Sequence, residues 1–214
     1  MPRSDTRAET QATPTPDASA APLINIRGVK VALGPLTREH FATFARWEND
    51  FSVGLYSGSP MRPQSLEAIT AHMEEDLKGE RRDRVGFIIY DLATLKPIGD
   101  VVLRNIWPMQ GLAEFGISLG EKEYWGKGYG TEATALMLDY AFSVLGLHNV
   151  MLWTSAYNER AVGAYLRAGF KEFGRRRESW RVGNHYYDTI FMECLASEFT
   201  SPYPRVVPEL EPRR

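Results

Sequence analysis

The stretch that decides the fold is Trp125-Gly-Lys-Gly-Tyr-Gly130, which follows the apolar segment 115–119 and precedes a long amphipathic segment from about 130 to 145. Glycines allow backbone N–H groups to point into one concavity, and the N-terminal end of a following helix adds positive potential there. A strand, a glycine-rich turn and a helix in this order make an anion site that needs no lysine. The turn therefore predicts a site for a phosphate or pyrophosphate group.

Upstream of this turn, the apolar pattern predicts antiparallel strands. Segments 84–92 and 97–105 flank a Lys-Pro turn, and 113–119 follows a Gln-Gly turn. A first strand is expected over about 26–36, with helices capped by Thr37 and Ser65. The stretch 49–63, which contains several glycines and prolines, is expected to be a loop.

Downstream, the order changes to helix (about 130–145), strand (149–155) and helix (about 160–168, ended by Gly169), then two strands over 171–181 and 185–194. A strand, a helix and a strand in succession imply a parallel pair. We therefore predict an α/β fold with a mixed, mainly antiparallel central sheet, one parallel junction and flanking helices.

Length and composition set further bounds. The 214 residues suit one domain, and the formal net charge of −2 gives no basic face for nucleic acid. Cys194 is the single cysteine, and no His/Cys cluster has metal-ligand spacing, so we expect a metal-free cytoplasmic protein. Residues 1–24 have no apolar run typical of a signal peptide or membrane span, and 200–214 are rich in proline. We predict a disordered tail over 1–24, a domain over 25–199 and a second tail over 200–214.

Three kinds of phosphate-binding site could use this glycine turn: a P-loop, a dinucleotide-binding fold and a coenzyme A site. A P-loop requires Ser or Thr directly after Gly-Lys, whereas Gly128 follows Lys127. A dinucleotide fold is compatible with Gly128-Tyr-Gly-Thr-Glu-Ala133, but the strand at 149–155 ends without the acidic residue that holds a ribose hydroxyl. Coenzyme A is the third.

The third ligand agrees with a family resemblance. The segment Tyr124-Trp-Gly-Lys-Gly-Tyr-Gly-Thr-Glu-Ala133 resembles the acetyl-CoA pyrophosphate loop of the GNAT superfamily of N-acetyltransferases. Asn158-Glu-Arg-Ala-Val-Gly-Ala-Tyr-Leu-Arg-Ala-Gly-Phe170 resembles the second signature of that superfamily. Trp125 stands at the first position of the loop pattern, where the family has Gln or Arg. The sequence Trp125-Gly-Lys-Gly-Tyr129 resembles that of the RimJ/RimL-type branch. The resemblance covers roughly residues 26–199.

The resemblance implies direct acetyl transfer from acetyl-CoA to a primary amine in a ternary complex, without a covalent acyl-enzyme. It implies that strand backbone pairs with pantetheine, that the loop binds the pyrophosphate and that Asn158 bonds the pantetheine arm. The implied cofactor residues are Ile117, Ser118, Leu119, Trp125, Gly126, Lys127, Gly128, Tyr129, Gly130, Thr131 and Asn158.

Two residues are predicted to be catalytic. An ammonium must lose a proton before it attacks, and Glu114, at the start of the apolar strand, matches a glutamate common in the branch. The leaving thiolate must gain a proton, and Tyr165 matches the family's tyrosine. The alternative for Glu114 is a solvated carboxylate at the start of a strand, and the alternative for Tyr165 is an aromatic side chain that only packs in the core. Acidic residues at 48, 50 and 74–76 could attract a cationic amine or simply lie in solvent at helix ends.

The acceptor cannot be identified from the sequence. A small amine, a polyamine, an aminoglycoside and a protein N-terminus all stay open, and so does homodimer formation. A non-catalytic acyl-CoA-binding module is the alternative function. We expect acetyl-CoA and an amine as partners, with neither nucleic acid nor membrane.

Overall fold

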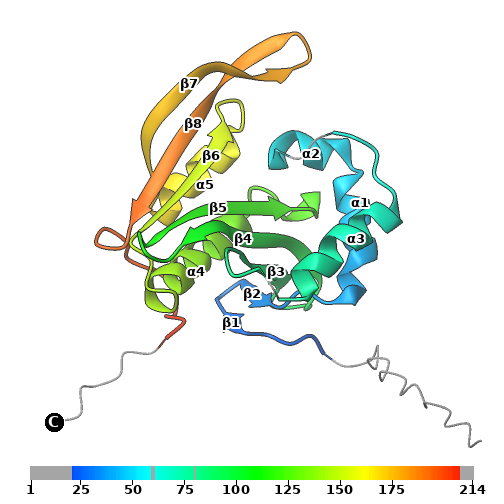
Figure 1. Ribbon diagram of the computed structural model, residues 1–214, viewed down its shortest axis with the longest axis horizontal. Coiled ribbons are helices and arrows are strands. Elements are labelled where there is room, and N and C mark those ends of the chain that lie inside the picture. The colour runs from blue at the N-terminus through cyan, green and yellow to red at the C-terminus, as the bar shows by residue number, and fades with distance from the viewer. Residues whose placement is uncertain (1–20, 59–60, 80, 208–214) are drawn as a thin grey trace, which may run out of the picture.

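The computed structural model describes residues 21–58, 61–79 and 81–207 (Figure 1). Most of the predicted N-terminal tail and the last part of the C-terminal tail lie outside the described residues. The strands are β1 (Ile26–Arg27), β2 (Val31–Gly34), β3 (Val85–Asp91), β4 (Pro97–Trp107), β5 (Leu112–Leu119), β6 (Asn149–Ser155), β7 (Lys171–Val182) and β8 (His185–Leu195).

These strands form one eight-stranded sheet in the order β1-β2-β3-β4-β5-β6-β8-β7. Neighbours are antiparallel except at the centre, where β5 and β6 run parallel. The mixed, mainly antiparallel sheet with one parallel junction is therefore confirmed. β7 and β8 are long and extend away from the rest of the sheet (Figure 1).

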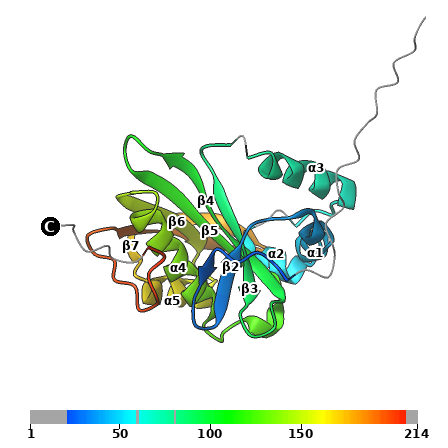
Figure 2. The same ribbon diagram turned by 90° about the horizontal axis from the view of Figure 1, so that it is seen from below.

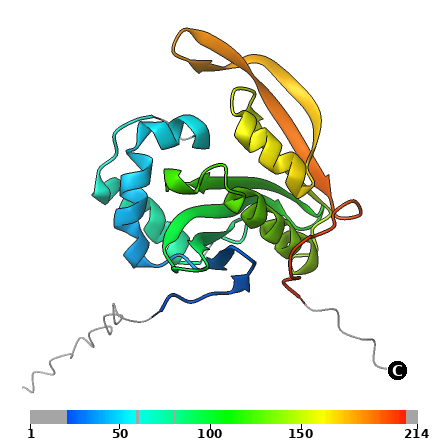
Figure 3. The same ribbon diagram turned by 180° about the vertical axis from the view of Figure 1, so that it is seen from behind.

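Helices cover both sides of the sheet. They are α1 (Phe41–Glu48), α2 (Phe51–Ser57), α3 (Leu66–Leu77), α4 (Tyr129–Ser143) and α5 (Glu159–Ala168). Helices α1 and α3 lie to one side of the strands β2 to β5, and α4 lies to the other (Figure 2). Seen from behind, α4 and α5 lie side by side across the sheet (Figure 3). α4 is buried around most of its circumference, because its central residues pack into the main core.

The prediction of a loop over 49–63 is wrong for residues 51–57, which form α2. Asp50 caps this helix by accepting the Ser52 N–H at 2.9 Å, and Gly58 ends it in the left-handed conformation. Val53 and Gly54 are buried in it. Tertiary packing therefore stabilises a helix that glycine content alone argued against.

The single first strand predicted over 26–36 is instead a hairpin of β1 and β2, turning at residues 28–30. The turn is held from outside the hairpin: Glu132 on α4 accepts the backbone N–H groups of Val29 and Lys30 at 2.5 and 2.8 Å. Val29, assigned to the strand by its apolar character, is exposed in this turn.

Packing continues past Phe199, where we predicted the domain to end. Tyr203 and Val206 pack against the main core, and the Val206 N–H donates to Asp139 on α4 at 2.6 Å. The described part of the predicted proline-rich tail therefore contacts the domain.

Candidate active site

The site begins where β5 and β6 separate. Their parallel pairing covers residues 112–114 of β5 and 149–151 of β6, after which β5 continues to Leu119 and β6 stays paired with β8. The strands diverge from that point (Figure 1). The edge of residues 115–119 that faces β6 is thus outside the sheet pairing of the described residues, and its backbone groups can pair with an extended ligand.

The predicted backbone positions Ile117, Ser118 and Leu119 lie on this edge and line a cavity of about 370 Å³ between β5 and α5. The Leu119 carbonyl already accepts the indole N–H of Trp125 at 2.8 Å. Leu119 therefore helps to position the loop as well as bordering the cavity.

The glycine turn opens into the same cavity. Gly126 and Gly128 have φ of 71° and 89°, which non-glycine residues adopt only with strain, and α4 begins at Tyr129. The predicted loop residues that line the cavity are Trp125, Gly126, Gly128, Gly130 and Thr131. Backbone donors and the positive end of α4 therefore converge there, as an anion site requires.

Two predicted loop residues, Lys127 and Tyr129, make other contacts. The Lys127 carbonyl accepts the Lys30 ammonium at 3.1 Å, and the Tyr129 hydroxyl donates to Asp91 at 3.4 Å. Neither side chain lines the cavity. Any contribution of these two positions to an anion comes through the backbone, as the glycine turn itself predicts.

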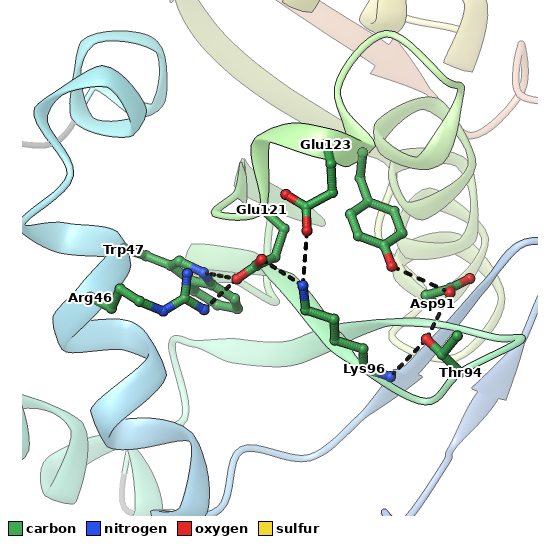
Figure 4. A network of polar contacts seen from close by, with 8 residues as sticks. Arg46, Trp47, Asp91, Thr94, Lys96, Glu121 and Glu123 are labelled. Atoms are coloured by element: carbon green, nitrogen blue, oxygen red, sulfur yellow. Dashed lines mark hydrogen bonds and ion pairs between the residues drawn. The ribbon is translucent and has the colours of Figure 1, made fainter.

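The chain entering the loop is fixed by a buried carboxylate, Glu121 (Figure 4). It accepts hydrogen bonds from Arg46 and Trp47 on α1 and from Lys96 before β4, the last two at 2.8 and 2.7 Å. Although burial raises the pKa of Glu121, hydrogen bonds from Lys96, Trp47 and Arg46 outweigh it and lower the pKa to about 2. An ionised Glu121 therefore ties the start of the loop to α1 and β4.

Asn158 is buried and its side chain has two contacts. Its Oδ1 accepts the Ala161 N–H at 3.3 Å, capping α5, and its Nδ2 donates to the Tyr56 carbonyl at 3.0 Å. Asn158 lines the cavity as predicted, but these contacts make it a link between α5 and α2.

Tyr165 on α5 lies at the boundary between this cavity and a larger cleft. Its ring packs edge-on against Phe115 and Phe170, with centroids 6.1 and 5.9 Å away. Its hydroxyl makes no hydrogen bond to any residue that the structure describes. Burial raises the pKa of Tyr165 to about 12, so the hydroxyl carries its proton at neutral pH. The Tyr165 ring is thus fixed by packing, while its hydroxyl is available to donate a hydrogen bond to a ligand.

The larger cleft, of about 890 Å³, lies against β4 and β5 beneath α1 and α3. Directly opposed residues of antiparallel strands share a face, so Asp100 lies with Ser118, and Arg104 with Glu114. The cleft is lined by Asp100, Arg104, Gly116 and Ser118 from that face. Gly116 leaves the middle of the face without a side chain.

Glu114 shares this face but its carboxylate is already bound. Arg104 donates to it from Nε at 3.0 Å and from Nη2 at 2.5 Å, Trp153 at 3.0 Å and Asn105 at 3.1 Å. These donors occupy the lone pairs of the carboxylate. Transfer of a proton to Glu114 therefore competes with the Arg104 ion pair.

At the α1/α3 side, the cleft collects three carboxylates: Glu48, Asp76 and Asp100. Burial, together with repulsion from Glu48 and Asp76, raises the pKa of Asp100 to about 7, which Arg84 offsets in part. Asp76 pairs with Arg84 at 3.2 Å and with Arg81 at 3.9 Å, whereas Glu48 and Asp100 form no ion pair within the described residues. Carboxylates that repel one another through a low-dielectric cleft attract a cation.

The other acidic residues noted in the sequence lie elsewhere. Asp50 pairs with Lys122 at 2.6 Å while capping α2, and Glu74 pairs with Arg38 at 2.7 Å. The sequence reading missed Asp100 and Glu121. An acid within the apolar segment 97–105 was the available signal for Asp100, whereas nothing local distinguishes Glu121 from a solvated residue.

The strand separation, the glycine turn and the helix behind it define an acyl-CoA-dependent transferase site. The family described as acetyltransferase (GNAT) domain matches residues 30–171, and this chain belongs to that family. It is an acetyl-CoA-dependent N-acetyltransferase.

Three proteins of this family have sequences similar to this chain. Spermidine N(1)-acetyltransferase of Vibrio cholerae is 32% identical over 133 residues, 62% of this chain and 72% of that protein. The Escherichia coli protein of the same name is 36% identical over 97 residues, 45% of this chain and 51% of its own length. A putative ribosomal N-acetyltransferase of Bacillus subtilis, YdaF, is 31% identical over 101 residues, 47% of this chain and 55% of that protein.

Solved structures agree with the fold. The structure of the Vibrio cholerae spermidine N-acetyltransferase in complex with CoA and spermine superposes with a TM-score of 0.71 at 25% identity, covering 79% of this chain and 97% of that one. Within residues 21–58, 61–79 and 81–207, no helix is long and apolar enough to cross a membrane. The same residues contain no cluster of His, Cys, Asp and Glu suited to a metal ion.

Proposed function

We propose that the acceptor is a polyamine such as spermidine. The observation that carries this proposal is the group of three carboxylates, Glu48, Asp76 and Asp100, in a cleft that also reaches Tyr165. A polyamine has several ammonium groups, so one can bind these carboxylates while another amine reaches the thioester. Two relatives named as spermidine N(1)-acetyltransferases support the same acceptor class.

In the proposed reaction, acetyl-CoA lies along the open edge of β5 with its pyrophosphate on the loop. The free amine attacks the thioester carbon, and a backbone N–H of residues 117–119 stabilises the oxygen that gains charge. The C–S bond then breaks, and the Tyr165 hydroxyl donates a proton to the thiolate sulfur. The attacking nitrogen loses its extra proton to solvent as the amide forms, and solvent returns a proton to Tyr165. The products are the N-acetylated amine and CoA.

The proton that the ammonium must lose before attack goes to Glu114 in our prediction. Because Arg104, Asn105 and Trp153 already bind that carboxylate, we propose transfer through a water molecule rather than by direct contact. A role in positioning Arg104 is the alternative that the contacts support.

The experiment for the acceptor is to measure kcat/KM for spermidine, spermine and a monoamine of similar length by release of the CoA thiol. We expect kcat/KM of the polyamines to exceed that of the monoamine by at least about tenfold, since the second ammonium binds partly buried carboxylates. Equal values for the monoamine and spermidine would contradict the proposal.

A protein N-terminus is the second acceptor we propose to test, which corresponds to the RimJ/RimL-type branch. Similarity to YdaF supports it, and the pairing of Arg81 and Arg84 with Asp76 reduces the negative charge that the cleft offers to a polyamine. A short peptide with a free α-amine, added to the same assay, distinguishes the two. Turnover of the peptide but not of spermidine would favour this branch.

We also propose self-association. A solved spermidine N-acetyltransferase from Vibrio cholerae is described as dodecameric, which exceeds the homodimer left open by the sequence. Light scattering of the purified protein gives the mass directly. A monomeric mass at micromolar concentration would contradict self-association.

A further inference from the structure

Arg160 lies on the first turn of α5 and contacts two aromatic rings from distant parts of the chain, in the corner where these rings meet. Its guanidinium carbon is 4.6 Å from the ring centroid of Tyr56 on α2 and 4.6 Å from that of Trp125 in the loop. The two rings also contact each other edge to face, with centroids 5.6 Å apart. Cation–π contacts with two rings restrain the position of the guanidinium and leave N–H groups available for a ligand.

Among the residues that the structure describes, the charge of Arg160 has no acidic partner. Within the part of the chain that the structure describes, its guanidinium forms neither an ion pair nor a hydrogen bond. By contrast, Arg46, Arg104 and Arg175 each pair with a carboxylate. A positioned guanidinium without a carboxylate is suited to an anionic ligand.

The available anion site is adjacent. Arg160 lines the same cavity as Gly126, Gly128 and Thr131, where backbone N–H groups and the N-terminal end of α4 meet. Arginine presents a planar fork of donors that matches phosphate oxygens, and such charged hydrogen bonds are stronger than neutral ones. The phosphates of CoA are the anions that this cofactor brings to the cavity.

Arg160 also connects this cavity to the larger cleft. Tyr56, on which it stacks, lines both spaces. Next to it, Asn158 donates to the Tyr56 carbonyl at 3.0 Å, and the Tyr157 hydroxyl donates to the Leu55 carbonyl. A ligand that fixes Arg160 therefore also restrains α2, which forms part of the cleft wall.

We propose that Arg160 binds the pyrophosphate of acetyl-CoA and, through its stacking on Tyr56, couples cofactor binding to the position of α2 beside the acceptor. The assignment depends on acetyl-CoA as the cofactor and not on which amine is the acceptor. Reciprocity of coupling requires that a ligand ordering α2 also strengthens cofactor binding.

Calorimetric titration tests the phosphate contact without turnover. The titrants are CoA, 3′-dephospho-CoA and pantetheine, and the variants are Arg160→Gln and the control Arg175→Gln, whose side chain pairs with Glu172 on exposed β7. We expect Arg160→Gln to bind CoA and 3′-dephospho-CoA about tenfold more weakly and pantetheine unchanged. Wild-type affinity in Arg160→Gln would overturn the proposal. A loss confined to CoA would also overturn it, by assigning Arg160 to the 3′-phosphate.

Hydrogen exchange tests the coupling. We expect CoA to slow amide exchange in residues 51–57 of the wild type, and not in Tyr56→Leu, which keeps the charge of Arg160 but removes one ring. Tyr56→Leu should still bind CoA within about threefold, because the phosphate contact is retained. If CoA leaves exchange of residues 51–57 unchanged in the wild type, or slows it equally in Tyr56→Leu, the coupling is wrong. Neither readout requires an acceptor, so the result is independent of the polyamine proposal.

Discussion

Asp100 on β4 lies directly opposite Ser118 on β5, and both line the cleft on the sheet face toward α1 and α3. This pairing brings a carboxylate with a raised pKa alongside the β5 segment that borders the cofactor cavity. The ion pair of Arg104 and Glu114 lies further along the same two strands. At about 3.4 Å per residue, Asp100 and Glu114 are separated by more than 10 Å along β5. The two acids therefore cannot serve the same amine nitrogen.

The first prediction concerns acceptor binding and pH. Because the pKa of Asp100 is raised to about 7, its charge develops between pH 6 and 8, while a polyamine stays cationic. The KM for spermidine should fall over this range by up to about tenfold, and Asp100→Asn should remove the dependence. His72 also lines the cleft, so His72→Gln is the control. A slope that is lost in His72→Gln and kept in Asp100→Asn would assign the dependence to the histidine.

The second prediction concerns stability. The pKa of Asp100 in the folded protein lies above the ordinary aspartate pKa of 3.8, so between these values the folded protein holds a proton that the unfolded chain releases. Folding is therefore favoured by this group below about pH 4, and that advantage is lost as pH rises to about 7. Asp100→Asn should melt several degrees above the wild type at pH 8 and show no difference near pH 4. Thermal melts at both pH values check this, and a lower melting temperature at pH 8 would contradict it.

The third prediction separates two roles of Glu114. If it accepts the proton, Glu114→Gln should lose about 10²- to 10⁴-fold in rate at low pH and recover as the amine deprotonates by itself. If it positions Arg104, the loss should be independent of pH and should be reproduced by Arg104→Gln. Rate profiles of both variants over pH 6 to 10 decide between the roles. An unaffected Glu114→Gln would exclude both.

The fourth prediction concerns the leaving group. Tyr165→Phe keeps the ring contacts with Phe115 and Phe170 and removes a hydroxyl that has no partner among the described residues. The melting temperature and the CoA affinity should stay unchanged, while kcat falls about 10²- to 10⁴-fold. A kcat within about twofold of the wild type would leave Tyr165 as a packing residue.

The fifth prediction concerns the loop backbone. Gly128 has φ of 89°, and a Cβ there would touch little, its nearest neighbour being Lys30 Nζ at 3.7 Å. Gly128→Ala should therefore act through strain, of about 1–2 kcal/mol, and weaken CoA binding by about tenfold. Gly174→Ala on β7 is the control, since its φ is ordinary and its Cβ would meet no described atom within 4 Å. Equal CoA affinities in the two variants would show that this strain does not shape the site.

The fold was largely predictable from the sequence because its signals are local. The strand, glycine turn and helix around 115–145 appear where predicted, and Ser65 and Gly169 bound their helices as expected. α2 was not predictable, because its stability comes from burial of Val53 and from contacts with Tyr157 and Asn158 about a hundred residues away.

The site was predictable only in part. A glycine loop carries its own conformational requirement, so its position follows from composition. The partners of a side chain depend on register instead. That Asp100 opposes Ser118, or that Glu114 opposes Arg104, depends on how β4 and β5 align, which one residue of slip would reverse. The contacts of Arg160 depend on α2, the loop and α5 packing together, and no local sequence pattern predicts that packing.

The order of these groups along the chain has a consequence for engineering. The carboxylates proposed to select the acceptor, Glu48, Asp76 and Asp100, all precede the turn at residues 108–111, whereas the loop, Arg160 and Tyr165 all follow it. Chimeras of two family members joined in that turn are expected to take their substrate preference from the first parent and their transfer chemistry from the second. Tyr56 belongs to the first segment and stacks on Arg160 of the second. When such a chimera is built, position 56 in the N-terminal segment should therefore carry the residue of the C-terminal parent.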